Sequence, residues 1–103
     1  MNTIKILKDK FVKTVAPDYT PVRELHTYLK DHGGIHFEKH QLEDGSWISR
    51  STNFIYGSIL TTGRDLGDLD VNTKDAILTA FEIPSSYAME ANIHQEGEEY
   101  ALA

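Results

Sequence analysis

The sequence predicts an α+β domain in which a small antiparallel sheet of three to four strands packs against two helices, at about residues 20–32 and 66–82. Two segments carry apolar residues at helical spacing, and short segments of alternating apolar and polar residues lie between them. Turns that contain glycine or proline separate these segments. A length of 103 residues, 40% of them hydrophobic and 25% charged, suits one modest hydrophobic core. Residues 1–103 are therefore expected to form a single domain.

The clearest predicted helix covers residues 20–32. Thr20 can cap its N-terminus, Pro21 suits the first helical position, and Gly33-Gly34 end it. Its apolar face, which needs a sheet or another helix to cover it, consists of Val22, Leu25, Tyr28 and Leu29. Ahead of the helix, residues 3–15 alternate loosely between apolar residues and lysine, which indicates a strand or an N-terminal extension.

Three short strands are predicted to follow the helix. Residues 35–41 alternate between apolar and polar side chains, residues 46–54 form a second half-buried segment, and a turn at Asp44-Gly45 joins them. Residues 56–62 form a third strand with an apolar, β-branched centre, and Gly63 permits a tight exit from it. The tail is expected to add one last strand, either at about 91–95 or at about 100–102.

The second helix is predicted to begin after Asp65, a plausible N-cap, and to end near Ile83-Pro84. Asp70 and Thr73 interrupt its apolar stripe, which predicts irregular first turns and a firm helix only from about Asn72. The stripe itself consists of Leu66, Leu69, Ala76, Ile77, Ala80 and Phe81. We interpret this strand-turn-helix as scaffold. If the Phe81 ring is fully buried, its truncation to alanine should cost about 3–5 kcal/mol.

The charge of the chain favours some partners over others. The formal net charge is −6, although Lys5, Lys8, Lys10 and Lys13 cluster near the start. A single domain that binds nucleic acid without a partner protein usually carries a basic surface, so direct nucleic-acid binding is not expected. The acidity indicates either a solvated surface or a basic protein partner. The chain has neither cysteine nor an apolar run long enough for a membrane span, so we expect a cytoplasmic protein without disulfides.

No motif predicts catalysis or a bound cofactor. His36 and His40 are four residues apart, but on a strand that spacing is roughly 13 Å, too far for one metal ion. Serines lie near these histidines without a GxSxG elbow. The carboxylates Asp65, Asp68, Asp70 and Asp75 could be imagined around divalent ions, but a helix cap and outer helix face explain Asp65, Asp68 and Asp75 more simply. We therefore expect no enzyme, no metal and no cofactor.

Four residues are candidates for contact with a partner protein. Trp47 opens the second strand and is either a core or rim aromatic or an interface anchor, because tryptophan is frequent in binding hot spots. Arg50, three residues later, should point to the opposite face of a regular strand. His36 and Glu38 on the first strand complete the set.

Residues 35–84 resemble the HicB-like antitoxin family. The resemblance consists of a DG-aromatic strand, a short strand ending in glycine, a cap and an Asn-x-Lys-acidic-Ala-Ile helix segment. In this chain these elements are Asp44, Gly45, Trp47, Gly63, Asp65, Leu66, Asn72, Lys74, Asp75, Ala76 and Ile77. The resemblance implies that residues 35–103 form a strand-strand-strand-helix-strand unit, similar to a trimmed ribonuclease-H-like sheet, after an extension at residues 1–34.

The resemblance implies a non-catalytic protein that binds and silences a small basic RNA-cleaving toxin. The chain departs from the family in its 34-residue preface, in Gly67, Asp70 and Thr73, and in lacking a DNA-binding segment after the domain. Two alternatives stay open. One is a HicA-like domain similar to double-stranded-RNA-binding domains, since a helix, three strands and a helix are predicted in that order. The other is a homo-oligomerising structural domain.

Overall fold

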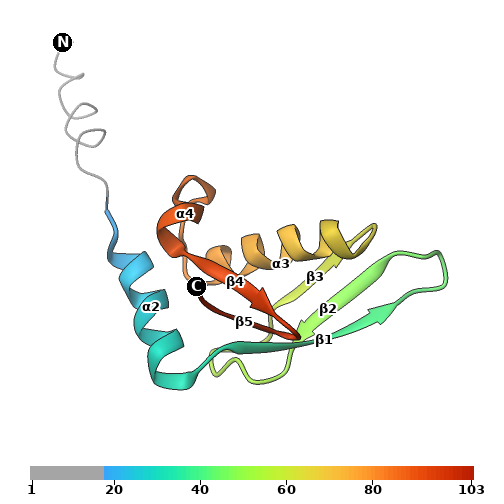
Figure 1. Cartoon of the computed structure of the whole chain (residues 1–103), viewed down its shortest axis with the longest axis horizontal. Helices are drawn as coiled ribbons and strands as arrows, with labels where there is room; N and C mark the ends of the chain where they lie inside the picture. Colours follow the sequence, from blue (N-terminus) through green and yellow to red (C-terminus); the bar gives the residue numbers. More distant parts are fainter. Residues whose placement is uncertain (1–17) are drawn as a thin grey trace, which may run out of the picture.

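The computed structural model describes residues 18–103, so the strand or extension predicted for residues 3–15 lies outside the described residues. The α+β class is confirmed: a helix, three strands, a helix and a terminal hairpin follow one another (Figure 1). The elements are α2 (Thr20–His32), β1 (Ile35–Gln41), β2 (Trp47–Ser51), β3 (Leu60–Gly63), α3 (Leu66–Ala80), the 3-10 turn η1 (Ser85–Tyr87), α4 (Ala88–Ala91), β4 (Ile93–Glu96) and β5 (Glu99–Leu102).

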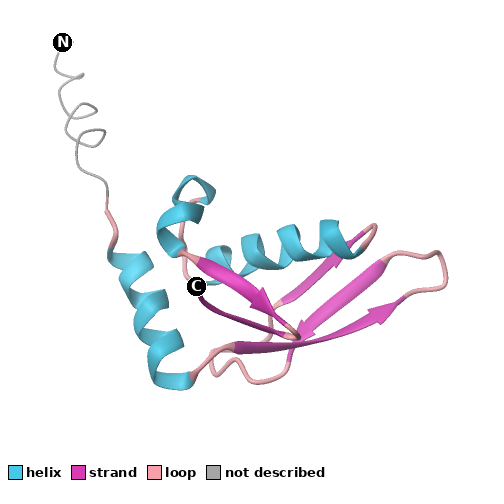
Figure 2. Cartoon of the chain, viewed as in Figure 1, coloured by secondary structure: helices cyan, strands magenta, loops and turns pink. Residues whose placement is uncertain are grey.

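The strands form one antiparallel sheet in the order β3-β2-β1-β5-β4 (Figure 2). Five strands, rather than the predicted three to four, are present because both candidate tail segments are strands of one hairpin. Gly97 in the two-residue loop of this hairpin has a φ of 63°, a positive value of the kind that such loops require. The sequence favoured a single tail strand because β4, at the sheet edge, is mostly polar and lacks a strong apolar alternation.

Alternation along β1 separates the two faces of the sheet. Ile35 and Phe37 are fully buried. His36 and Glu38, which alternate with them along the strand, point to the other face and are partly exposed. The strand register places Tyr100 beside Ile35 on the buried face. One core on this face joins both long helices to the sheet, and it contains Val22, Leu25, Tyr28, Leu29, Ile35, Phe37, Ile59, Ile77, Leu78, Ile83, Ala91 and Tyr100.

Helix α2 begins and ends as its turn residues predict. The N-cap residue, however, is Tyr19 rather than Thr20, and Asp18 before it accepts at Oδ1 a hydrogen bond of 2.9 Å from the backbone N–H of Thr20. That hydrogen bond holds the pKa of the Asp18 carboxyl below its ordinary value. Gly33 follows the helix with a φ of 80°, a left-handed value that glycine adopts readily. Four α2 residues belong to the core, so α2 packs in the same hydrophobic core as α3 and the sheet.

Helix α3 is regular from Leu66, so the prediction of irregular first turns is wrong. Asp65 caps it as predicted, accepting a 2.8 Å hydrogen bond from the backbone N–H of Asp68. The two residues that interrupt the apolar stripe both face the sheet. Thr73 is buried there, and the Asp70 carboxylate accepts a hydrogen bond from the Tyr100 hydroxyl. Leu66 is exposed instead, because the buried face turns away from it.

The core role predicted for Phe81 needs correction. Phe81 is the C-cap residue of α3 and is only partly buried, because the helix ends there and the ring lies at the rim of the core. Leu69 and Ile77 are the fully buried residues that hold α3 on the sheet. After Phe81 the chain turns through Glu82, whose φ of 59° is unusual for a residue other than glycine, and Ile83 returns to the core.

Candidate functional site

The sheet face opposite the helices is the first candidate site, and we call it the open sheet face. The strand register assigns to it His36, Glu38 and His40 of β1, Ile48 and Arg50 of β2, Leu60 and Thr62 of β3, His94 and Glu96 of β4, and Glu99 and Ala101 of β5. These side chains are half-buried or exposed, and Leu60 is 60% exposed. An exposed sheet face that carries both apolar and charged side chains is suited to forming an interface with another molecule.

Three of the four predicted contact residues come together on the open sheet face. The register pairs Glu38 with Arg50, and their side chains form an ion pair in which Arg50 Nη2 lies 3.6 Å from Glu38 Oε1. His36 Nε2 lies 3.3 Å from Glu98 Oε1 in the β4–β5 turn. Trp47 lies on the other face, half-buried opposite Gly63, so it does not share a surface with the other three.

The charge of the described residues is more negative than that of the whole chain. Residues 1–17 contain four of the ten Lys and Arg residues and one of the 16 Asp and Glu residues, so residues 18–103 carry a formal net charge of −9. On the open sheet face, Glu38, Glu96 and Glu99 outnumber Arg50. Exposed ion pairs contribute only about 0–1 kcal/mol, so a cation from a partner can replace Arg50 beside Glu38 at small cost.

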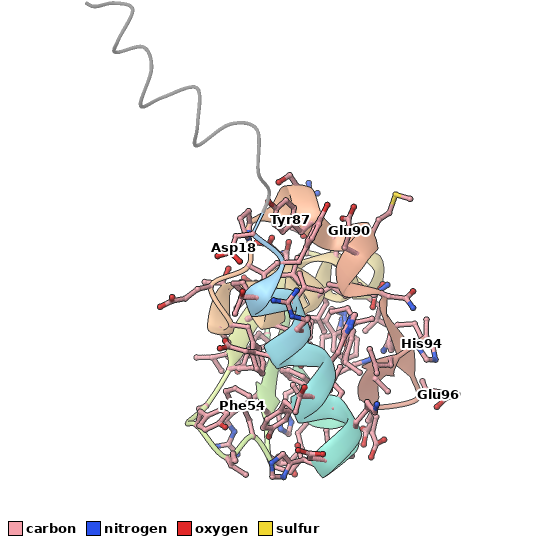
Figure 3. The ribbon with its side chains drawn as sticks, turned by 90° about the vertical axis from the view of Figure 1, so that its left-hand side faces the viewer. Asp18, Phe54, Tyr87, Glu90, His94 and Glu96 are labelled. Atoms are coloured by element: carbon pink, nitrogen blue, oxygen red, sulfur yellow. The ribbon has the colours of Figure 1, made fainter. Side chains whose placement is uncertain are left out.

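The acidic part of this face extends to the sheet edge. On β4, His94 Nε2 lies 3.7 Å from Glu96 Oε2, and Figure 3 shows both side chains at the opposite side of α2 from Phe54. Phe54 lies in the loop after β2, so in Figure 3 the β2–β3 loop is on one side of α2 and strand β4 is on the other. Glu98 and Glu99 continue the acidic region along the hairpin next to β1.

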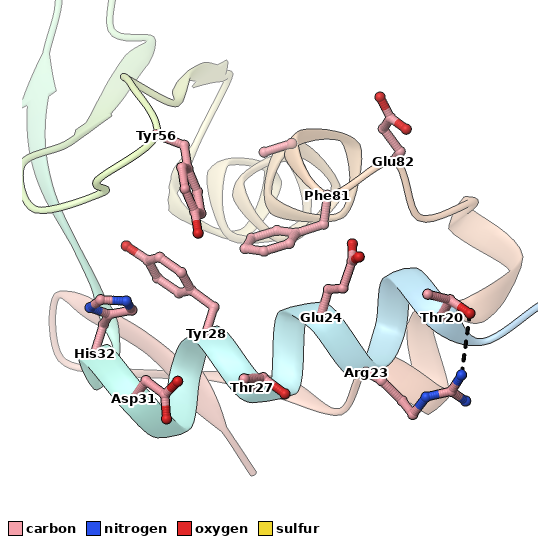
Figure 4. Close-up of a pocket in the computed structure, with 11 residues that line it drawn as sticks. Thr20, Arg23, Glu24, Thr27, Tyr28, Asp31, His32, Tyr56, Phe81 and Glu82 are labelled. Atoms are coloured by element: carbon pink, nitrogen blue, oxygen red, sulfur yellow. Dashed lines mark hydrogen bonds between the residues drawn. The ribbon is translucent and has the colours of Figure 1, made fainter.

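Sequence reasoning missed a second candidate site, which we call the aromatic groove. It has a volume of about 770 Å³ and lies between α2, the β2–β3 loop and the C-terminal end of α3 (Figure 4). Its lining residues are Thr20, Arg23, Glu24, Thr27, Tyr28, Asp31, His32, Tyr56, Ala80, Phe81 and Glu82. These come from three segments that are distant in the sequence, so no local motif marks the groove.

Among residues 18–103, Tyr100 is the buried ionisable group whose pKa departs from its ordinary value. Burial raises the pKa of its phenol, and the Asp70 carboxylate, which accepts its hydrogen bond at 2.9 Å, raises it further. Asp70 also lies 3.3 Å from Lys74 Nζ one helical turn along α3. A tyrosine held neutral in this way fixes β5 to α3 and is not an activated nucleophile or base.

Alkaline pH is expected to destabilise the fold through Tyr100. The unfolded chain loses the phenol proton near pH 10, whereas the folded chain holds it because the folded pKa is raised. The stabilisation is therefore fully present below about pH 10 and is lost above it, by up to about 1.4 kcal/mol per pH unit. Urea unfolding from pH 9 to 11 should show a shallower decline for Tyr100→Phe than for the wild type. Tyr56→Phe, an exposed control, should follow the wild type, and identical slopes for all three would contradict the prediction.

Within the described range, residues 18–103, no group of three His, Asp or Glu side chains is arranged to hold a metal ion. His36 and His40 both lie on the open sheet face of β1. Residues 18–103 contain no helix of sufficient length and apolarity to cross a membrane.

No family model matches the chain, and no curated protein or solved structure is significantly similar to it.

Proposed function

We propose that this protein is a non-catalytic binding domain that receives a small basic protein on its open sheet face, as a HicB-like antitoxin receives an RNA-cleaving toxin. The observation that supports the proposal is the formal net charge of −6, combined with an open sheet face on which carboxylates outnumber cationic groups. Complementary charge accelerates association and disfavours acidic competitors.

The open sheet face also offers apolar contact area. Ile48 is the second residue of β2, and Leu60 on the neighbouring strand is 60% exposed. An interface needs such apolar contacts, because charges at the rim mainly set the rate and specificity of association. Arg50 lies between Leu60 and Glu38 in a row across the strands, and His36 lies further along β1 beside Glu99. Arg50, Glu38 and His36 are expected to contact the partner, whereas Trp47 on the other face is not part of this surface.

The test is co-expression with the product of a short basic reading frame beside this one. We expect the two proteins to co-elute in size-exclusion chromatography and expect this protein to rescue growth from the basic product. The association rate should fall as salt rises from 0.1 M to 1 M, because the Debye length shrinks from about 10 Å to about 3 Å. Neither co-elution nor rescue would be observed if the proposal is wrong.

A pair of charge reversals assigns the surface. Glu38→Lys should slow association because it reverses a carboxylate at the centre of the open sheet face. Glu43→Lys makes the same change in net charge on the exposed β1–β2 loop and serves as the control. Equal slowing by both variants would indicate that only the overall charge matters and would remove the open sheet face as the binding surface.

One observation favours a second candidate function. The order α2, β1, β2, β3, α3, with both helices joined to one core, fits the helix-three-strand-helix arrangement of a double-stranded-RNA-binding or HicA-like domain. The negative charge argues against it, because such domains hold phosphates with basic side chains. Purified protein that binds or cleaves double-stranded RNA at 0.1 M salt would favour this candidate. A stable homo-oligomer that ignores the basic protein would favour a structural role.

A further inference from the structure

The aromatic groove combines three aromatic rings in a fixed arrangement. Tyr28 forms the floor: it is 5% exposed, and its hydroxyl accepts a 3.1 Å hydrogen bond from the backbone N–H of Ile55. The ring centroids of Tyr56 and Phe81 each lie 5.6 Å from that of Tyr28, at interplanar angles of 46° and 67°. The rings are therefore inclined to one another and lie together at the groove, as Figure 4 shows, and Tyr56 is the ring that solvent can reach.

Tyr56 is the unusual member of the three. It is 71% exposed, although it sits on a loop whose neighbour Phe54 is packed against the core. The loop is held at both sides, because the Tyr28 hydroxyl binds the Ile55 N–H and Gly57 donates its N–H to the Phe54 carbonyl oxygen. A large aromatic ring that a fixed loop presents to solvent beside other rings is typical of a binding surface.

Carboxylates also line the groove. Glu24, Asp31 and Glu82 line the groove, and among residues 18–103 none of them forms an ion pair. The cationic group of the lining, Arg23, donates a hydrogen bond of 3.2 Å from Nη2 to the Thr20 hydroxyl, and Figure 4 shows it directed away from the rings. The groove is thus negative as well as aromatic, and this combination attracts a cation rather than an anion or a neutral apolar group.

We propose that the aromatic groove binds the arginine side chain of a basic protein. A guanidinium group is planar, so it can stack on the exposed face of Tyr56 while its N–H groups are directed toward the Glu24 carboxylate, which points into the groove in Figure 4. Charge-assisted hydrogen bonds of this type are stronger than those between neutral groups. The inference goes beyond the proposed function, because the groove is formed by the helices and a loop rather than by the open sheet face, and its test requires no partner protein.

The test uses the isotope-labelled full-length protein and two small probes, Nα-acetyl-arginine amide and its citrulline analogue. Citrulline has the same length and a planar urea group but no charge. We expect the arginine probe to shift the NMR amide signals of residues around the groove, and we expect the citrulline probe to bind at least about fivefold more weakly because the cation–π and ionic attractions are lost. Equal binding of both probes, shifts confined to other surfaces, or no groove shift throughout the titration would each overturn the proposal.

Three variants distinguish the contributions of the rings and the carboxylates. Tyr56→Ala should weaken the arginine probe about two- to fivefold, whereas Tyr56→Phe should retain its binding because the π face is kept. Glu24→Gln should weaken binding most at low salt, and Glu43→Gln on the distant β1–β2 loop should leave it unchanged. Because Tyr56 is 71% exposed, its truncation should leave the core intact, and unchanged signals from β1 and β5 would verify this. Unaltered binding in Tyr56→Ala and Glu24→Gln together would refute the assignment of the groove.

Discussion

Phe37→Ala is expected to lower the free energy of unfolding by about 3–5 kcal/mol. Phe37 is completely buried on β1, the central strand of the sheet, and its ring packs edge-on against Tyr100 at a centroid distance of 5.4 Å and an interplanar angle of 80°. Truncation removes that contact and leaves a cavity between the sheet and the helices. Because small domains are stable by only about 5–15 kcal/mol, the variant should be marginally folded in a urea denaturation experiment.

Phe81→Ala is the matched control for this prediction. The same atoms are removed, but Phe81 is only partly buried at the end of α3, so solvent can fill part of the space and the loss should be clearly smaller. Equal losses for the two variants would show that the core is centred near the end of α3 rather than on β1. The comparison therefore measures where the core lies, independently of how stable the protein is overall.

The elements that the sequence predicted well are those with local signals at both ends. Helix α2 has Pro21 near its start and Gly33 after its end, and β1 alternates strictly through Ile35 and Phe37. These signals act through backbone geometry and through the period of the side chains, and neither depends on distant parts of the chain. The opposite orientation of Trp47 and Arg50 followed from the same two-residue period.

The features that the sequence did not predict depend on contacts between distant segments. Asp70 looks out of place on an apolar stripe until Tyr100, thirty residues further along the chain, donates a hydrogen bond to its carboxylate at the inner side of α3. Strand β4 has little apolar pattern of its own and is held by pairing with β5. Local propensity carries no information about such partners, so these residues read as loop or interruption.

The candidate sites show the same division. The alternation of β1 and β2 places His36, Glu38 and Arg50 on one face, but only the position of both helices on the other face makes that face open. The aromatic groove requires Tyr28, Tyr56 and Phe81 to converge from a helix, a loop and a second helix. One or two aromatic residues in each segment are unremarkable in the sequence, so the groove could be found only from the fold.

Gly63→Ala is expected to destabilise the protein by about 1–3 kcal/mol or more. Gly63 ends β3 and is buried where α3 comes closest to the sheet. A Cβ atom at this position would lie 2.5 Å from the backbone nitrogen and 2.7 Å from the Cα of Leu69. Both atoms belong to the backbone of α3, so a side-chain rotation cannot relieve the clash. The helix would have to move away from β3, and the fully buried Leu69 would lose its packing.

Gly67→Ala, four residues along the chain, is the control with the opposite expected sign. A Cβ at Gly67 would lie 3.5 Å from the Asp65 side chain, an ordinary contact distance, and the position is inside the first turn of α3. Alanine is favoured over glycine in a helix by up to about 1 kcal/mol, so this variant should unfold at the same or a higher urea concentration than the wild type. If both substitutions are neutral, α3 does not approach β3 as closely as the structure shows; if both destabilise equally, the helix start rather than the approach at Gly63 limits stability.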